Sequence, residues 1–149
     1  MRFLVLLTGL ALAAAGCAGG PALRNGVSGG QVVAEARKQL GATYRYGGMD
    51  PDKGFDCSGL VAYCYGRLGI RLPHSTAALF KQGRTIPKGK LQPGDLVFFN
   101  TDGFGPSHVG IYSGGDKMVH APSSGSKVRE EKISIPYWKS RFLRAKRLD

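Results

Sequence analysis

The sequence predicts an α+β fold, with helices near the N-terminus packed on a central antiparallel sheet of about five to six strands. Two observations lead to this prediction. Apolar residues recur at helical spacing between residues 31 and 82, whereas short apolar runs bounded by Gly and Pro follow from residue 91 onward. Helices followed by strands are typical of α+β domains, while alternating helices and strands favour a parallel sheet.

Residues 1–16 are interpreted as a secretory signal peptide and residues 17–30 as a flexible tether. The chain starts with the basic Arg2, continues with an apolar run over 3–13 and then has three small residues. This run is shorter than the roughly 20 apolar residues that span a bilayer. Residues 17–30 are rich in Gly, Ala, Ser and Pro and offer little to bury. Residues 31–149 then form one domain of ordinary size.

Three helices are expected in the first half of this domain. Ser28 and Gln31 have the spacing of a capping box, which predicts where the first helix begins. The second helix follows Asp56, a good N-cap residue, and its apolar residues recur on one face. Glycines are placed to end all three helices. The expected segments are Ser28–Gly41, Cys57–Leu68 and Thr76–Gln82.

Five strands and the connections between them are expected in the second half. A Pro-Gly-Asp sequence predicts a tight turn, with Asp95 as its turn-forming residue. The Gly-rich segment 101–106 predicts a loop, and so does the segment 44–53. The expected strands are Leu96–Phe99, His108–Ser113, Lys117–Ala121, Lys127–Ile135 and Phe142–Arg147.

The three cysteines have different expected roles. Cys57 and Cys64 are seven residues apart on one predicted helix, which separates them by about 10.5 Å along its axis. A disulfide needs Cα atoms roughly 4.4–6.8 Å apart, so these two cannot form a bridge while the helix stands. Cys64 is interpreted as a buried apolar residue. Cys57 needs another reason to be present in an exported protein, and catalysis supplies one.

Cys57, His108 and His120 form a candidate catalytic set. A thiol at a helix start has its charged form favoured by the helix dipole. An imidazole that takes the thiol proton, held by a third polar group, completes a cysteine nucleophile. Unpaired backbone N–H groups at the helix start can donate to an oxyanion, although the charge of Asp56 opposes the thiolate. The set therefore indicates a thiol hydrolase that needs no cofactor.

Structural roles are the alternative for each of these residues taken alone. A single cysteine or strand histidine is more often a core residue, and the three together could also hold zinc, although no further ligand is obvious. His74 is interpreted as an ordinary exposed residue. Tyr137 and Trp138 are interpreted as core or rim residues rather than a sugar-binding platform.

The two histidines restrict the turn of the hairpin that joins them. His108 and His120 must share a face of the sheet to touch, and a regular two-residue turn would place them on opposite faces. We therefore expect an odd-length or bulged turn over 114–116, with one glycine at positive φ. In a three-residue turn Ser113 pairs with Lys117, and Gly110 pairs with His120. If the turn were regular, Asp102 or another polar group would have to replace His120.

Several motifs, in order, resemble the NlpC/P60 family of cell-wall peptidases, which has a papain-like fold. The resemblance implies that Cys57 is the nucleophile, His108 the general base and His120 the orienting third member. It also implies that Tyr46 lies near the oxyanion position. Asp56 and Ser58 match residues lining the subsite for the N-terminal side of the peptide. The motifs are Tyr-Arg-Tyr-Gly-Gly (44–48), Asp-Cys-Ser-Gly-Leu-Val (56–61), Leu-Pro (72–73), Leu-Gln-Pro-Gly-Asp-Leu-Val-Phe-Phe (91–99), His-Val-Gly-Ile-Tyr (108–112) and His-Ala (120–121).

The same resemblance implies a function. Members of the family usually hydrolyse stem peptides of peptidoglycan, most often between γ-linked D-glutamate and the diamino acid, which makes a D,L-endopeptidase the leading hypothesis. A thiol amidase or acyltransferase acting on a different bond is one alternative. A wall-binding lipoprotein with an inactive site is another, although the intact Cys57, His108 and His120 argue against it.

The location and partners follow from the N-terminus and the charge. Cys17 after Gly16 resembles a bacterial lipobox, although Ala14 stands where that motif usually has Leu, and the alternative is plain cleavage with Cys17 as an incidental thiol. Ala18 fits sorting to an outer membrane, so we expect a lipid-anchored monomer facing the periplasm. The net charge of +11 favours an anionic wall partner over nucleic acid, for which no motif is present; a solvated basic surface is the alternative.

Overall fold

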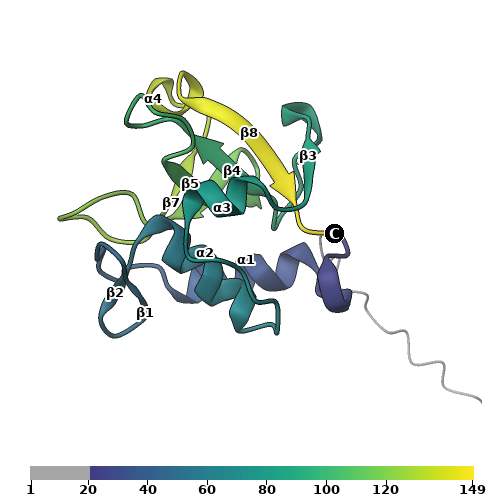
Figure 1. The fold of residues 1–149 in the computed structure, drawn as a ribbon, viewed down its shortest axis with the longest axis horizontal. Coiled ribbons are helices and arrows are strands. Elements are labelled where there is room, and N and C mark those ends of the chain that lie inside the picture. The colour runs from purple at the N-terminus through teal and green to yellow at the C-terminus, as the bar shows by residue number, and fades with distance from the viewer. Residues whose placement is uncertain (1–20) are drawn as a thin grey trace, which may run out of the picture.

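The computed structural model describes residues 21–149, so the signal peptide and Cys17 lie outside the described residues. A short 3-10 turn, η1, precedes α1, and both ends of the described chain meet, because the Arg24 backbone N–H donates to the Leu148 carbonyl oxygen (Figure 1). None of the helices among residues 21–149 has the length and apolarity required to cross a bilayer. The elements are η1 Arg24–Gly26, α1 Gly29–Lys38, β1 Met49–Asp50, β2 Gly54–Phe55, α2 Cys57–Gly66, α3 Thr76–Phe80, β3 Arg84–Ile86, η2 Lys88–Lys90, β4 Leu96–Phe99, β5 His108–Gly114, β6 Lys117–His120, β7 Arg129–Lys132, α4 Pro136–Lys139 and β8 Phe142–Arg147.

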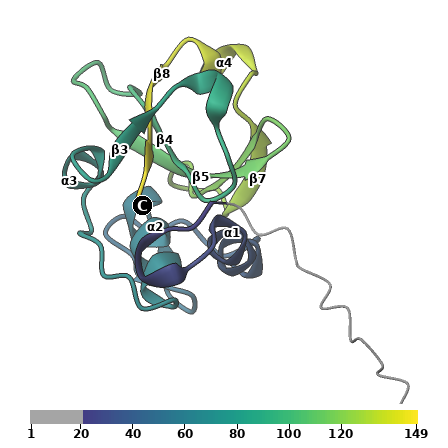
Figure 2. The same cartoon turned by 90° about the vertical axis from the view of Figure 1, so that its right-hand side faces the viewer.

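A six-stranded antiparallel sheet forms the centre of the molecule, which confirms the predicted α+β class. Its strand order is β3-β8-β4-β5-β6-β7, and β1 and β2 form a separate two-stranded sheet. The helices α1 and α2 lie together on one side of the main sheet, and α4 lies at the opposite end (Figures 1 and 2). The sheet is strongly curved, so its second face encloses a small core of its own (Figure 2).

Two hydrophobic clusters occupy the two faces of the sheet, and β4 contributes to both. Leu96 and Phe98 pack into the larger cluster with α1 and α2, whereas Val97 and Phe99 pack into the smaller cluster with Trp138. Side chains alternate along a strand, so an unbroken apolar run is what a strand buried on both faces requires. β4 therefore lies between the two hydrophobic clusters and packs against both.

The predicted helices are confirmed, with shorter C-terminal ends for α2 and α3. Ser28 forms the expected capping box with Gln31, and the Asp56 side chain caps α2 by accepting from the Gly59 N–H. The strand expected over 127–135 is wrong in extent, because the chain leaves the sheet after β7 and Pro136 begins α4. The two-residue strand β1 inside the expected loop, the two-residue strand β2 just after it and the edge strand β3 were not predicted.

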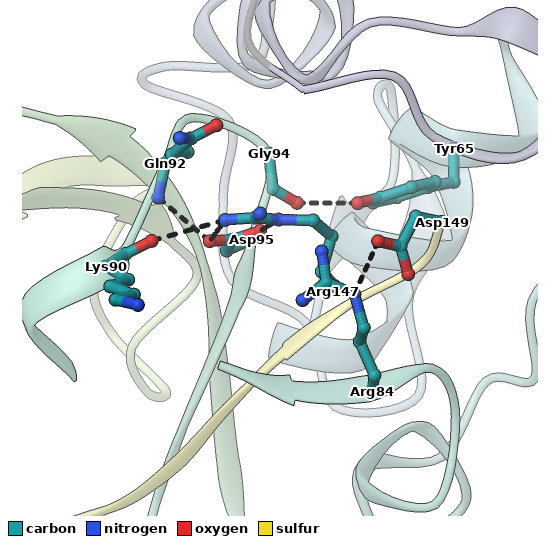
Figure 3. Close-up of polar contacts among 8 residues, drawn as sticks. All are labelled: Tyr65, Arg84, Lys90, Gln92, Gly94, Asp95, Arg147 and Asp149. Carbon is teal, nitrogen blue, oxygen red and sulfur yellow. Dashed lines mark hydrogen bonds and ion pairs between the residues drawn. The ribbon is translucent and has the colours of Figure 1, made fainter. Parts of the chain in front are cut away.

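A buried polar cluster ties the sheet to the helices at the turn before β4 (Figure 3). Asp95 accepts from the Gln92 N–H at 2.8 Å, as the turn prediction requires. Its two oxygens also receive Arg147 Nε at 2.7 Å and Nη2 at 2.8 Å, a bidentate pair between β4 and β8. The Tyr65 hydroxyl of α2 donates to the Gly94 carbonyl oxygen at 2.6 Å. The interpretation of Asp95 as a turn former alone is thus incomplete, since the same carboxylate anchors the last strand.

We expect Arg147→Met to lower the free energy of unfolding by about 3–5 kcal/mol, because it leaves the Asp95 carboxylate buried without its partner. Arg84→Met is the matched control. It removes an exposed pair with Asp149 and should cost at most about 1 kcal/mol. Urea denaturation measures both values. Equal costs for the two variants would contradict a structural role for the buried pair, whereas recovery in an Asp95→Leu/Arg147→Met double variant would support it.

Candidate active site

Cys57 lies at the first turn of α2, where the helical part of the molecule meets the sheet. Its sulfur is 3.5 Å from the Thr76 hydroxyl oxygen of α3, and the backbone N–H groups of Val109 on β5 and Ser58 also face it. The start of α2 lies close to the preceding loop. The approach is so close that a Cβ on Gly59 would be 1.9 Å from the Gly48 carbonyl oxygen. The thiol therefore sits between α2, α3 and the start of β5.

The free thiol is held in its neutral form. Burial raises the pKa of Cys57, and the Thr76 hydroxyl and the Val109 N–H only partly offset this effect; the Asp56 carboxylate raises the pKa further. Desolvation therefore opposes the effect of the helix start on the thiolate, and the pKa of the Cys57 thiol is raised in the free protein. Ionisation of the thiol consequently needs a base at the moment of attack.

A line of hydrogen bonds leads from β5 to β7. His108 Nε2 lies 2.8 Å from His120 Nδ1, and His120 Nε2 lies 2.9 Å from Glu131 Oε2. An ionised carboxylate only accepts, so His120 must donate from Nε2 and accept at Nδ1. His108 then donates from Nε2, which leaves its Nδ1 as an unprotonated acceptor. The bonding pattern thus makes His108 a base through one particular nitrogen.

Glu131 is the functional residue that the sequence analysis missed. It lies on β7, where Glu130 points the other way, to Ser113 and to Arg37 of α1. Burial tends to raise the pKa of the Glu131 carboxyl, but hydrogen bonds from Trp138 and His120 outweigh it and lower the pKa. Glu131 is therefore ionised at neutral pH. The acidic pair 130–131 beside the histidine hairpin was the one available signal, and it did not show which of the two faces the imidazoles.

Both imidazoles are buried and neutral at pH 7. Burial lowers the pKa of His108 to about 3, and the neighbouring His120 lowers it further. Burial lowers the pKa of His120 to about 4, against the opposing effect of Glu131. Trp138 stacks on His108 with ring centroids 4.9 Å apart, which fixes the ring plane of the base. The expectation that Trp138 is a core residue is confirmed.

The zinc alternative has no support in this geometry. Both ring nitrogens of His120 are engaged in hydrogen bonds, one to His108 and one to Glu131, so neither is free to bind a metal. Within residues 21–149, no three His, Cys, Asp or Glu side chains are grouped so as to hold a metal ion.

The turn of the histidine hairpin is bulged, as expected. Ile111 pairs with Val119, and this register places His108 and His120 on one face. The pairing then shifts by one residue, so that Gly114 rather than Ser113 pairs with Lys117, and the predicted Ser113 pairing is wrong. Gly114 has φ 95°, which confirms the predicted positive φ. Asp102, the fallback residue, is not needed; it accepts instead from the Phe104 N–H in its own loop.

Asp56 organises the loops next to the thiol. Besides capping α2, it accepts from the Gly47 N–H at 2.8 Å and lies 2.7 Å from His74 Nε2. His74 is exposed, as interpreted, but it is not merely a surface residue, because its ring links the segment before α3 to the α2 cap. Ser58 is buried, with its hydroxyl 3.4 Å from Asp56 Oδ1. Both Asp56 and Ser58 adjoin Cys57, and their role in binding a substrate stays a prediction.

The structure places Tyr44, rather than Tyr46, beside the thiol. The Tyr46 side chain is 89% exposed. Tyr44 packs against the main core together with Cys57, and its pKa is raised by burial first and then by the proximity of the Cys57 thiol. Tyr44 is therefore the better placed phenol for an oxyanion. The two tyrosines lie in one short motif, and the sequence alone did not show which one turns inward.

A cysteine at a helix start, packed against an antiparallel sheet that carries the histidines, is typical of the papain-like class of folds. The NlpC/P60 family model matches residues 41–147, and the chain belongs to this family. The chain is similar in structure to an NlpC/P60 family protein from Bacillus cereus ATCC 10987, with a TM-score of 0.77 and 30% identity over 82% of this chain and 40% of that one. It also resembles the NlpC/P60 domain of the peptidoglycan hydrolase SagA, with a TM-score of 0.70 and 36% identity over 80% of this chain and 97% of that one.

Two curated relatives are similar over most of the domain. One is the gamma-DL-glutamyl hydrolase of Bacillus subtilis (strain 168), 42% identical over 79% of this chain and 29% of that protein. The other is the murein DD-endopeptidase MepH of Escherichia coli (strain K12), 39% identical over 74% of this chain and 42% of that protein. The chain thus matches about a third to two fifths of the length of these relatives.

The two neutral histidines predict a specific sensitivity to acid. Both folded-state pKa values lie below the usual 6.5, so the unfolded chain binds more protons as the pH falls below that value. Stability should therefore fall between about pH 6.5 and 4, by about 1.4 kcal/mol per pH unit for each histidine. Denaturation at a series of pH values should show a shallower slope for His120→Gln than for the natural chain. Identical slopes would mean that His120 is not buried in its neutral form.

The two tyrosines give a matched pair of variants. If Tyr44 donates to the oxyanion, Tyr44→Phe should lower kcat by roughly 10²-fold, since a donor of this kind acts in the transition state. Tyr46→Phe should leave kcat nearly unchanged, because the exposed Tyr46 ring lies away from the thiol. Steady-state kinetics on stem-peptide fragments measures both. The opposite ranking would restore Tyr46 as the residue at the oxyanion position.

Proposed function

We propose that this protein is a cysteine peptidase that hydrolyses stem peptides of peptidoglycan, cutting between γ-D-glutamate and the diamino acid. The observation that carries this proposal is the hydrogen-bonded line Glu131–His120–His108 on the sheet, together with the Cys57 thiol, which the backbone N–H of Val109, the residue after His108, faces. Each polar group in this line has a hydrogen-bond partner except His108 Nδ1. That nitrogen is the acceptor that a nucleophilic thiol needs for its proton. The printed names of the relatives, a glutamyl hydrolase and a murein endopeptidase, support the substrate class.

The geometry supports acyl transfer in two steps. The Cys57 sulfur attacks the amide carbonyl carbon while His108 Nδ1 takes the thiol proton. The resulting oxyanion is stabilised by backbone N–H groups at the start of α2 and by the Tyr44 hydroxyl. His108 gives the proton to the leaving amine, the C–N bond breaks, and a thioester remains on Cys57. Water, deprotonated by the same nitrogen, then hydrolyses the thioester and restores the thiol.

The three alternative functions predict different products. A thiol amidase or acyltransferase uses the same residues on another bond, and a DD-endopeptidase, as MepH is named, cuts a cross-link between D-residues. A wall-binding lipoprotein releases nothing. Mass spectrometry of fragments released from purified peptidoglycan separates these outcomes. Fragments that end in γ-D-glutamate, with the diamino acid on the complementary fragment, support the proposed bond.

Cys57→Ser should reduce hydrolysis by roughly 10³-fold or more while leaving the fold intact, because a serine hydroxyl is far less acidic than a thiol. Cys64→Ser is the control: Cys64 is fully buried in the main core, so this variant should keep its activity and lose modest stability. The sacculus digest gives the activity, and thermal unfolding gives the stability. Near-normal hydrolysis by Cys57→Ser would rule out a thiol enzyme.

We also propose that a lipid on Cys17 anchors the protein to the cell envelope, in an outer membrane with the domain facing the periplasm. Support comes from the lipobox-like sequence at Cys17 and from the Gly- and Ala-rich residues that follow it. Cys17→Ser should move the protein from the membrane fraction to the soluble fraction without lowering activity on soluble fragments. A natural chain that is found soluble and without lipid would contradict the anchor.

A further inference from the structure

A pocket of about 340 Å³ with a mixed polar and apolar lining opens beside Trp138 and Glu131, the side chains that contact His108 and His120. The elements that form it are the β4–β5 and β6–β7 loops, β7 and α4. None of its lining residues belongs to α1, α2 or the loops around them. The residues that matter for its chemistry are Thr101, Ser123, Arg129, Glu131, Tyr137 and Trp138.

The pocket is on the side of the site where the leaving group must go. Asp56, Ser58 and Tyr44 adjoin the thiol, come from α2 and the chain before it, and do not line the pocket. His108 must protonate the leaving nitrogen, so that nitrogen points from the thiol toward the imidazole. Trp138 stacks on the ring of His108 and also lines the pocket. A substrate chain that continues beyond the leaving nitrogen therefore passes into this pocket.

Arg129 places a positively charged guanidinium in the lining of the pocket. Its Nε bonds to Glu131 Oε2 at 3.2 Å, its side chain is 51% exposed, and its terminal Nη groups have no other hydrogen bond among residues 21–149. Glu131 Oε2 is shared between Arg129 Nε and His120, and Glu131 also accepts from Trp138, so only one edge of the Arg129 guanidinium is engaged. A planar guanidinium with its outer N–H groups free fits a carboxylate through two parallel bonds.

The wall opposite suits the same ligand. Tyr137 is 47% exposed, and its ring offers an apolar surface for the carbon chain of a residue. The Arg141 guanidinium lies 3.8 Å from the centroid of that ring and adds a second positive charge near the pocket. The hydroxyls of Thr101 and Ser123 can supply further donors.

We propose that this pocket binds a free carboxylate carried by the residue on the leaving side of the scissile bond, with Arg129 as the recognition group. The proposal rests on the proposed function and adds a preference to it. The enzyme favours stem peptides that end in a free α-carboxylate directly after the cut over peptides in which that carboxyl is amidated or extended.

The test compares two tripeptides of the form L-Ala-γ-D-Glu-X, where X is the diamino acid found at the cut in the sacculus digest. One carries a free α-carboxylate on X and the other an α-carboxamide. We measure kcat/KM at pH 7 for the natural chain, for Arg129→Gln and for Lys132→Gln. Lys132 is the matched control, because it is an exposed cation on the same strand and alternation places it on the opposite face.

The natural chain should prefer the free acid by roughly tenfold, as expected for one charge-assisted pair at a half-exposed site. Arg129→Gln should abolish the preference by slowing cleavage of the acid selectively, while Lys132→Gln keeps it. Arg129 also touches Glu131, so a merely structural role would slow both peptides by the same factor and keep the ratio. That outcome, or equal rates for both peptides with the natural chain, overturns the inference and leaves the proposed function standing. A sacculus digest with no cut at γ-D-glutamate overturns the proposed function, and the inference with it.

Discussion

The turn at Pro93-Gly94-Asp95 is the constraint on which the arrangement of the molecule depends (Figure 3). Asp95 holds Arg147 of β8 in a buried bidentate pair, and Gly94 receives the Tyr65 hydroxyl of α2. One short turn thus joins the helix that carries the thiol to the sheet that carries the histidines. Removing two charges from water is costly, so the pair is stable only while both partners and their hydrogen bonds are in place. The position of α2 relative to the sheet therefore depends on this turn. The position of the thiol relative to the histidines depends on it as well.

Burial and hydrogen bonding together determine the protonation states of the residues in the site. Desolvation favours the neutral forms of Cys57, His108 and His120, so the free protein holds a thiol and two neutral imidazoles rather than an ion pair. Glu131 then determines what the neutral groups can do. Its carboxylate accepts from His120, His120 accepts from His108, and the remaining nitrogen of His108 is left as a base. The negative charge of Glu131 also stabilises the imidazolium that forms when His108 takes the thiol proton.

The two sides of the histidine pair have different origins in the chain. The acyl side is formed by loops around the start of α2, and their geometry depends on close backbone contacts such as Gly59 against Gly48. The leaving side is formed by the ends of strands and by α4, with the Arg129–Glu131 pair at its centre. Under the proposed function, this division assigns recognition of the two halves of a peptide to separate segments of the chain.

Local patterns in the sequence predicted the start of α2 and the turn between the histidines, because both depend on residues that are close together in the chain. Capping and helical spacing gave the start of α2, and the requirement that His108 and His120 share a face predicted an odd-length or bulged turn between them. What was missed depends on contacts between distant segments. Glu131 required the register of β7, and the choice between Tyr44 and Tyr46 required the path of a loop. The Asp95–Arg147 pair joins residues 52 positions apart. None of these contacts leaves a periodic signal.

The same tautomer argument gives the most direct test of the central claim, that Glu131 fixes His108 as a base through Nδ1. Nitrogen NMR of the histidine-labelled protein at pH 7 reports which ring nitrogen carries the proton in each imidazole. The account predicts that His108 and His120 are both neutral and both protonated at Nε2, and that Glu131→Gln disturbs this pattern. An imidazolium at either position, or a proton on Nδ1 of His108 in the natural chain, would contradict it.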